Sequence, residues 1–357
     1  MSPWVAWFPV LSAALSFALC YAAIPALIQL SLVKRLYDEP DARKTHTRRI
    51  GALGGIPIFG AFLFSFVLFS AGLDYPQQNS ILAAYIILFS MGIKDDLFPL
   101  SPSKKIVGQL LAVCLVVFVG NVRMESLYGL FGIGELSCSV SVMGSVVLFL
   151  LLINSFNFID GINGLSSGLG VLILLIYAYW FYRMQEVLFL ILCLSYAGAL
   201  LGFLPYNYRR KAKIFMGDSG SMILGFNLAV ITVFFIQKSV VAEPNFFFAI
   251  GSAVYAFALV LIPVFDTVRV VVLRLMRGRS PFSPDRNHIH HVLLDAGLSH
   301  RQGTAVLVTT AAGFALLATV LKGRMLPKYQ LLLFVGLALL LSQVPRWMKS
   351  RGSAPTA

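Results

Sequence analysis

Residues 146–164 read VVLFLLLINSFNFIDGING, an unbroken apolar run that ends in regularly spaced polar residues. The polar members, Asn154, Asn157, Asp160 and Asn163, follow one another at intervals of three residues. Ionisable side chains at membrane depth are costly and are kept mainly where they act on a ligand or an ion. The stretch therefore predicts a membrane helix that carries a polar site at one end.

The composition is that of a polytopic membrane protein. Of 357 residues, 58% are hydrophobic and only 12% are charged, with a mean hydropathy of +0.84. Soluble domains are about a quarter charged, and a spanning helix needs about 20 apolar residues. We expect an all-α protein with 10–11 transmembrane helices. Apolar windows place them at 7–30, 51–72, 79–93, 105–121, 140–158, 163–183, 187–204, 219–237, 246–273, 303–321 and 328–345.

The basic residues predict the orientation. Of the 28 Lys and Arg residues, all but six fall in loops, tails or adjoining helix ends on one side of the predicted membrane. The exceptions are Arg123, Arg183, Lys238, Lys322, Arg324 and Lys328. Because cytoplasmic loops carry the excess of Lys and Arg, we expect an external N-terminus and a cytoplasmic C-terminus. The first apolar segment has no small-residue cleavage site and is interpreted as a retained helix.

The net charge and the cysteine content further restrict the class of protein and its partners. The net charge of +13 follows from basic loops that orient the protein and lie against anionic lipid, so we expect no nucleic-acid partner. Binding of anionic substrates is a second reason for the positive net charge. The four cysteines are scattered without CxxC spacing, which favours neither a disulfide framework nor a zinc site. We expect one membrane domain over residues 1–346 and a short basic cytoplasmic tail at 347–357.

Two further acidic motifs lie at predicted helix ends on the cytoplasmic side. Asp95 and Asp96 end the third predicted helix, where adjacent carboxylates repel each other unless a cation neutralises them. Asp218 opens the eighth, directly after the basic and aromatic stretch 206–213. A solvated helix end and an ordinary N-cap are the structural alternatives. A metal that bridges carboxylates to phosphates accounts for both motifs at once.

The polar run at 154–163 suggests a shared ligand. On a continuous helix, steps of three residues slip by about 60°, so Asp160 and Asn163 would lie on one face and could hold an ion together. Hydrogen bonding between helices explains the presence of Asn154 in an apolar run, but it does not explain the carboxylate of Asp160.

Basic and histidine-rich segments complete the pattern. Residues 288–291 read HIHH within an arginine-rich loop, which favours recognition of an anion over zinc binding, with a solvated loop as the alternative. Lys44 lies in a basic approach to the glycine-rich stretch 51–55, at a helix N-terminus that suits an anion. Asp266 either pairs with Arg269 along one helix or belongs to the site. Together these residues predict Mg²⁺-assisted phosphoryl chemistry at the membrane surface.

The order of four motifs resembles that of the polyprenyl-phosphate N-acetylhexosamine-1-phosphate transferases of glycosyltransferase family 4. The motifs are KDD at 94–96, NFIDGING at 157–164, FMGDSG at 215–220 and PDRNHIHH at 284–291. The similarity extends from His46 to about Gln302. The interrupted HIHH is similar to the WecA/TagO branch, whereas the MraY branch carries three adjacent histidines.

The resemblance implies a reaction. Undecaprenyl phosphate and a UDP-N-acetylhexosamine, by default UDP-GlcNAc, would give undecaprenyl-diphospho-sugar and UMP in the bacterial cytoplasmic (inner) membrane. It implies Mg²⁺ as cofactor, with Mn²⁺ as a substitute. UDP-FucNAc, UDP-QuiNAc, UDP-GalNAc and UDP-MurNAc-pentapeptide stay open as donors. The downstream glycan, for example O-antigen in lipopolysaccharide biosynthesis, and a homodimeric state stay open too.

The resemblance also implies residue roles. It makes Asp95, Asp96, Asp160 and Asp218 catalytic, and Asp218 with Asn163 the metal ligands. The implied substrate-binding residues are Lys44, Lys104, Lys105, Asn157, Asn163, Asn207, Arg286, His288, His290 and His291. Relatives often have Asp at the position of Asn163, so this site would carry one charge fewer.

Other classes fit less well. A secondary transporter would place carboxylates near the bilayer midplane in repeated halves. An intramembrane aspartyl protease would want Tyr-Asp and Gly-x-Gly-Asp, and position 215 is Phe. No Walker loop is present, which excludes a typical ATP-driven pump.

Overall fold

The computed structural model describes residues 6–36, 50–73, 75–127, 130–241, 252–281, 283 and 285–352. These residues are helical except for loops and isolated β-bridge residues, among them the pair Ser126 and Glu135. The predicted all-α polytopic class is thereby confirmed. Apolar runs in a membrane must satisfy their backbone hydrogen bonds internally, and the α-helix does this within one segment.

The helices follow one another through short loops. The bounds are α1 Phe8–Val33, α2 Gly55–Ser70, α3 Gln78–Leu97, α4 Pro102–Cys114, α5 Cys138–Ile159, α6 Leu165–Arg183, α7 Val187–Asn207, α8 Gly217–Val241, α9 Ser252–Met276, α10 Ile289–Asp295, α11 His300–Leu321 and α12 Pro327–Gly352. Helix α4 continues as a π-helical turn, Leu115–Val119, and a short 3₁₀ turn spans Leu130–Gly132.

Every predicted apolar segment overlaps one of these helices. Among the described residues, nine helices are long and apolar enough to cross a membrane. Helix α2 has 16 residues, and α3, whose last turn carries Lys94, Asp95 and Asp96, is not among the nine. The ninth predicted segment begins outside the described residues. Helix α12 continues to Gly352, into the predicted tail.

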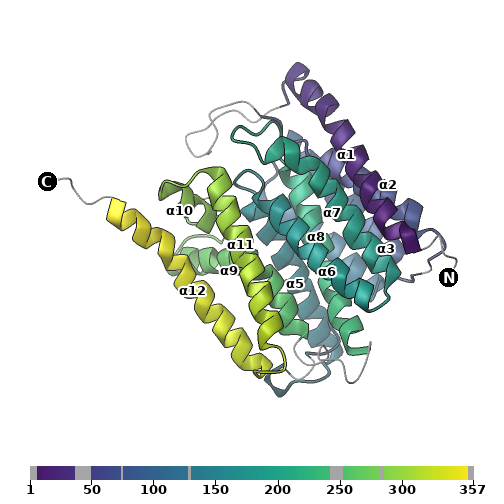
Figure 1. Ribbon diagram of the computed structural model, residues 1–357, viewed down its shortest axis with the longest axis vertical. Coiled ribbons are helices and arrows are strands. Elements are labelled where there is room, and N and C mark those ends of the chain that lie inside the picture. The colour runs from purple at the N-terminus through teal and green to yellow at the C-terminus, as the bar shows by residue number, and fades with distance from the viewer. Residues whose placement is uncertain are drawn as a thin grey trace.

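The helices form a bundle around α8. In Figure 1, α1 and α2 flank one side and α11 and α12 the other. Helix α8 packs against α5, α3 and α2, whereas α7 packs against α1 and α6. The whole apolar window of α8 is buried. This central helix begins at Gly217, so every segment that packs against its first turn meets at one end of the bundle.

Glycines allow this close packing. The backbone N–H groups of Gly54 and Gly55 donate to the carbonyl oxygens of Phe215 (2.9 Å) and Met216 (2.7 Å), which ties the start of α2 to the start of α8. A Cβ on Gly55 would lie 2.3 Å from the backbone nitrogen of Gly220. The glycine-rich stretch 51–55 therefore serves backbone contact between two helix starts.

We predict that Gly225→Ala destabilises the bundle. A Cβ at Gly225 in α8 would lie 2.4 Å from the carbonyl oxygen of Leu152 in α5, and overpacking costs about 1–3 kcal/mol. Gly313→Ala in α11, whose Cβ would meet nothing within 4 Å, is the matched control. Thermal unfolding in detergent should show a lower Tm for Gly225→Ala alone. An unchanged Tm for that variant would contradict the packing.

Candidate functional site

Two adjoining cavities open at one end of the bundle. The first, here called the acidic cavity, has a volume of about 560 Å³ and is lined by Asp95, Asp96, Asp160 and Asp218 among others. The second, called the histidine cavity, has about 400 Å³ and is lined by His288, His290 and His291 among others. Lys105, Asn157, Asp160, Gly161 and His291 line both. The two cavities therefore form one continuous site.

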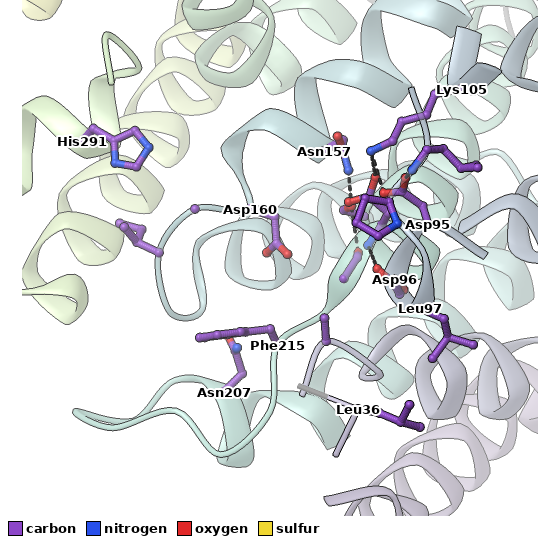
Figure 2. Close-up of a pocket in the computed structure, with 18 of the residues that line it drawn as sticks. Leu36, Asp95, Asp96, Leu97, Lys105, Asn157, Asp160, Asn207, Phe215 and His291 are labelled. Atoms are coloured by element: carbon purple, nitrogen blue, oxygen red, sulfur yellow. Dashed lines mark hydrogen bonds and ion pairs between the residues drawn. The ribbon is translucent and has the colours of Figure 1, made fainter. Parts of the chain in front are cut away.

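Figure 2 shows how the labelled side chains lie. Asp95, Asp96 and Lys105 gather on one side, Asp160 lies centrally, and His291 lies across from the carboxylates. They come from the end of α3, the start of α4, the loop after α5 and the short helix α10. Residues far apart in sequence are thus brought together by the packing of helix ends.

Asp96 organises the start of α8. Its carboxylate accepts hydrogen bonds from the backbone N–H groups of Asp218 (2.6 Å) and Ser219 (3.1 Å), and from the Ser219 hydroxyl (2.5 Å). The first N–H groups of a helix have no partner within the helix and attract negative charge. Asp96 thus caps α8 from another helix and fixes the backbone that carries Asp218.

Gly217 makes this arrangement possible. Its φ is +74°, a conformation that L side chains rarely adopt. A Cβ there would lie 2.1 Å from the Ala52 carbonyl oxygen and 2.6 Å from Oδ1 of Asp96.

Lys105 bridges two other carboxylates. Its Nζ lies 2.6 Å from Oδ2 of Asp95 and 2.7 Å from Oδ2 of Asp218. The second oxygen of Asp95 accepts the backbone N–H of Leu100 at 2.6 Å, in the loop that turns α3 into α4. The ammonium therefore neutralises charge that would otherwise push the two carboxylates apart.

Asp160 faces both cavities from the end of α5. Burial raises the pKa of its carboxyl group well above the usual value, and the negative charges of Asp218 and Asp96 raise it further. Asn157, one turn earlier, donates from its amide to the Ser221 hydroxyl of α8 at 3.0 Å. A cation in the cavity would relieve the repulsion around Asp160.

The chemistry of these donors fits a hard dication. Mg²⁺ prefers carboxylate and amide oxygens and is commonly held by one or two carboxylates plus substrate phosphates, and Asp95 and Asp218 already face one positive charge in common. Within the described residues, no group of three His, Cys, Asp or Glu side chains is close enough to form a metal site. The described part of the chain thus offers no preformed zinc cluster. A dication would have to replace or join the Lys105 ammonium.

Burial favours the neutral form of two imidazoles in the histidine cavity, those of His290 and His291. Burial lowers the pKa of His290 well below its usual value. Burial, with the nearby charge of Arg286, lowers the pKa of His291 to about 4. His290 is 1% exposed, and neither ring nitrogen has a hydrogen-bond partner. Buried polar atoms without partners are rare, so this ring is available for a polar ligand.

Gly161 gives the His290 ring its space. A Cβ on this glycine would lie 2.2 Å from Nε2 of His290. The loop after α5 therefore contacts the histidine segment through a residue without a side chain.

Several predicted site residues lie elsewhere. Lys104 is exposed and lines neither cavity. Arg286, also outside the lining, pairs with Asp295 at 3.0 Å. Asn207 lines the acidic cavity, but its amide bridges the Gly164 N–H (2.6 Å) and the Ile214 carbonyl (2.9 Å). Lys44 lies outside the described residues.

Asn163 lines neither cavity. Helix α5 ends at Ile159 and Gly164 has a φ of +79°, so the argument from a shared helical face does not apply. The Asn163 amide donates to the Arg209 carbonyl at 2.9 Å, while its own oxygen is buried without a partner. Its role as a metal ligand stays a prediction.

The sequence analysis missed a buried ion pair in the histidine cavity. Arg274 is 5% exposed, and its Nε lies 2.8 Å from Oδ2 of Asp285. Both residues line the cavity. The sequence does hint at both residues. Arg274 is a charged residue in the last turn of an apolar helix, and Asp285 lies three residues before His288. Only the fold shows that they meet.

The fold and the site define a polytopic membrane protein with a lysine-bridged acidic cavity at its helix ends. The model of glycosyl transferase family 4 matches residues 79–236. The chain is 33% identical over 296 residues to the undecaprenyl-phosphate alpha-N-acetylglucosaminyl 1-phosphate transferase of Escherichia coli, covering 80% of this chain and 75% of that protein. Its counterpart of the same name from Yersinia pestis is 30% identical over 334 residues, covering 91% and 87%.

A relative from a third organism is similar over most of the chain as well. The decaprenyl-phosphate N-acetylglucosaminephosphotransferase of Mycolicibacterium smegmatis is 32% identical over 288 residues, covering 75% of this chain and 71% of that protein. The chain belongs to glycosyl transferase family 4, as the motif order predicted, and it is a multi-pass membrane transferase.

We predict that Lys105→Gln lowers the stability of the metal-free protein. The variant leaves Asp95 and Asp218 without their shared cation, and a partly buried charge left unpaired costs about 1–3 kcal/mol. The Tm in EDTA should fall, and added Mg²⁺ should raise the Tm of the variant more than that of the wild type. The exposed neighbour supplies the control, Lys104→Gln, which should change neither value. Equal behaviour of the two variants would refute the bridging role.

Proposed function

We propose that this protein transfers N-acetylhexosamine-1-phosphate, by default GlcNAc-1-phosphate, from a UDP-sugar to undecaprenyl phosphate. The products would be undecaprenyl-diphospho-sugar and UMP. The activity for which relatives that match most of the chain are named supports the acceptor and the transferred group. The reaction would initiate a cell-envelope glycan.

One observation carries the proposal. Lys105, Asn157 and Asp160 line both cavities, so a ligand in the histidine cavity and another in the acidic cavity would meet beside the same side chains. A transfer between two phosphate-bearing substrates needs such a shared wall. Arg274 and the histidines suit the nucleotide-sugar donor, and the carboxylate–lysine cluster suits the reacting phosphates.

The chemistry demands positioning more than activation. An oxygen of the lipid phosphate attacks the β-phosphorus of the donor, and the bond from that phosphorus to the bridging oxygen breaks. The electron pair leaves with UMP. A phosphate monoester has a second pKa of about 6, so near neutral pH the nucleophile needs no strong base. The protein must hold two anions in line and screen their repulsion.

The chain supplies that screening from several sides. Lys105 places a positive charge beside Asp95 and Asp218 at the junction of the cavities, and the Arg274–Asp285 ion pair lies beside the histidines. Bound Mg²⁺, for which Asp218 and Asp95 are the proposed ligands in this structure, would neutralise charge on the diphosphate and the leaving group. Asp160 would complete the acidic wall.

The hydrogen bonds of the carboxylates favour direct attack over a covalent aspartyl intermediate. Both oxygens of Asp96 accept hydrogen bonds from the start of α8. Those of Asp95 accept from Leu100 and Lys105. A nucleophilic carboxylate would have to give up these partners, whereas the lipid phosphate brings its own oxygen.

The location of the site suits a lipid acceptor. The cavities open at the bundle end that carries the predicted cytoplasmic loops, and the apolar helices beside it suit a polyprenyl chain. We propose that this end faces the cytoplasm, where a soluble nucleotide sugar is available, and that the protein lies in the bacterial inner membrane.

UMP release tests the proposal. Purified protein with undecaprenyl phosphate and Mg²⁺ should form UMP from UDP-GlcNAc, and EDTA should stop the reaction until Mg²⁺ is restored. A panel with UDP-GalNAc, UDP-FucNAc, UDP-QuiNAc and UDP-MurNAc-pentapeptide would identify the donor. No UMP from any donor, in a sample that melts cooperatively, would refute the proposed function and favour the secondary transporter.

We predict that Asp218→Asn abolishes turnover without loss of the fold. The amide keeps the shape of the side chain but removes one of the two charges that Lys105 bridges, and loss of an electrostatic catalytic group costs about 10²–10³ in kcat. UMP release should fall by at least that factor, while the variant still unfolds in one cooperative transition. Wild-type turnover would remove Asp218 from the reacting centre.

A further inference from the structure

Asp266 is a buried carboxylate beside the histidine cavity. It lies in α9 and is 2% exposed. One oxygen accepts the backbone N–H of Ile289 at 3.0 Å and the Arg269 guanidinium at 2.6 Å. The other oxygen lies 2.9 Å from Nδ1 of His288. A single side chain of α9 thus contacts the start of the histidine segment at both backbone and ring.

The histidine segment depends on this contact for its position. Helix α10 has seven residues, too short to be stable by itself. Asp266 satisfies its first N–H, and Arg269 also donates to the carbonyl of Asn287 at 2.6 Å. The two side chains of α9 therefore pin residues 287–289 to the wall of the cavity.

The same contact selects one tautomer of His288. A carboxylate only accepts hydrogen bonds, so the proton of the neutral ring must reside on Nδ1. The charge of Asp266 is also matched by Arg269, whose guanidinium lies 2.6 Å from the other carboxylate oxygen. Because Nδ1 is engaged and the residue lines the histidine cavity, Nε2 is the nitrogen left for a ligand.

We propose that Asp266 is a positioning residue that holds His288 as the Nδ1–H tautomer, with Nε2 as a hydrogen-bond acceptor in the histidine cavity. An acceptor there recognises a hydroxyl or amide N–H of the donor's sugar, and not a phosphate oxygen, which has no proton to give. The identity of that ligand rests on the proposed function. The assignment of the His288 tautomer does not depend on the proposed function.

Nitrogen NMR of the full-length protein in detergent, labelled with ring-¹⁵N histidine, tests the tautomer directly. The chain has five histidines, and His288→Gln assigns the signal. At a pH where the ring is neutral, wild-type His288 should show a protonated Nδ1 and an unprotonated Nε2. Asp266→Asn, whose amide both donates and accepts, should lose that preference. Asp295→Asn, a carboxylate change on α10 away from His288, should keep it.

Kinetics separates positioning from general support of the fold. Asp266→Asn should raise KM for the UDP-sugar about tenfold, the effect of one lost hydrogen bond, with KM for the lipid phosphate unchanged. A purely structural role would lower Tm and impair both substrates together. A wild-type Nε2–H tautomer, or an Asp266→Asn protein with the wild-type tautomer and donor KM, would overturn the inference. The NMR result needs no turnover, so an inactive protein would refute the proposed function alone.

Discussion

Repulsion among carboxylates is the constraint on which this site depends. Four aspartates from three separate segments line one cavity at the end of an apolar bundle. Like charges at such distances disfavour ionisation unless hydrogen bonds or cations compensate them. The structure compensates each in a different way. The start of α8 satisfies Asp96, Lys105 satisfies Asp95 and Asp218, and Asp160 keeps a raised pKa.

In the proposed reaction, that compensation prepares the site for its phosphate-bearing substrates. Lys105 provides the positive charge that a substrate-bound dication would also provide, so the cavity is organised before any ligand enters it. Electrostatic groups set in place before reaction avoid the cost of rearranging them in the transition state. The central position of α8 helps to organise the cavity in this way. Gly55 and Gly92 bring the start of α2 and the end of α3 directly against the first turn of α8. Packing in the membrane core thus determines the geometry at the surface.

The histidine segment follows the same principle at a second place. Its position depends on Asp266 and Arg269 of α9, and Arg274 of the same helix pairs with Asp285 on the approach to it. Helix α9 therefore organises the histidine cavity, as the start of α8 organises the acidic cavity. The two sides share Lys105, Asn157 and Asp160, which is where a phosphoryl transfer between two substrates would take place.

How much was predictable differs from residue to residue. The apolar run at 146–153 predicted α5, and its polar end predicted a site, because hydropathy and polar spacing are local properties. The relation between Asp160 and Asn163 was not predictable, because the helix ends at Ile159 and the Asn163 amide donates to the Arg209 carbonyl. Lys104 and Lys105 are equivalent in sequence, yet only the second faces the cavity, since helix rotation is set by packing against α3 and α5.

The sequence by itself determined the membrane class, the helical segments and the concentration of acidic and histidine groups at their ends. These three properties depend on composition and on neighbouring residues. They can be predicted from sequence because polar groups in lipid carry a large energetic cost. Only the tertiary structure decided which of those groups meet. Lys105 and Asp218 are 113 residues apart, and His288 finds its carboxylate on another helix. Such contacts arise from how whole helices pack, and no local pattern records them.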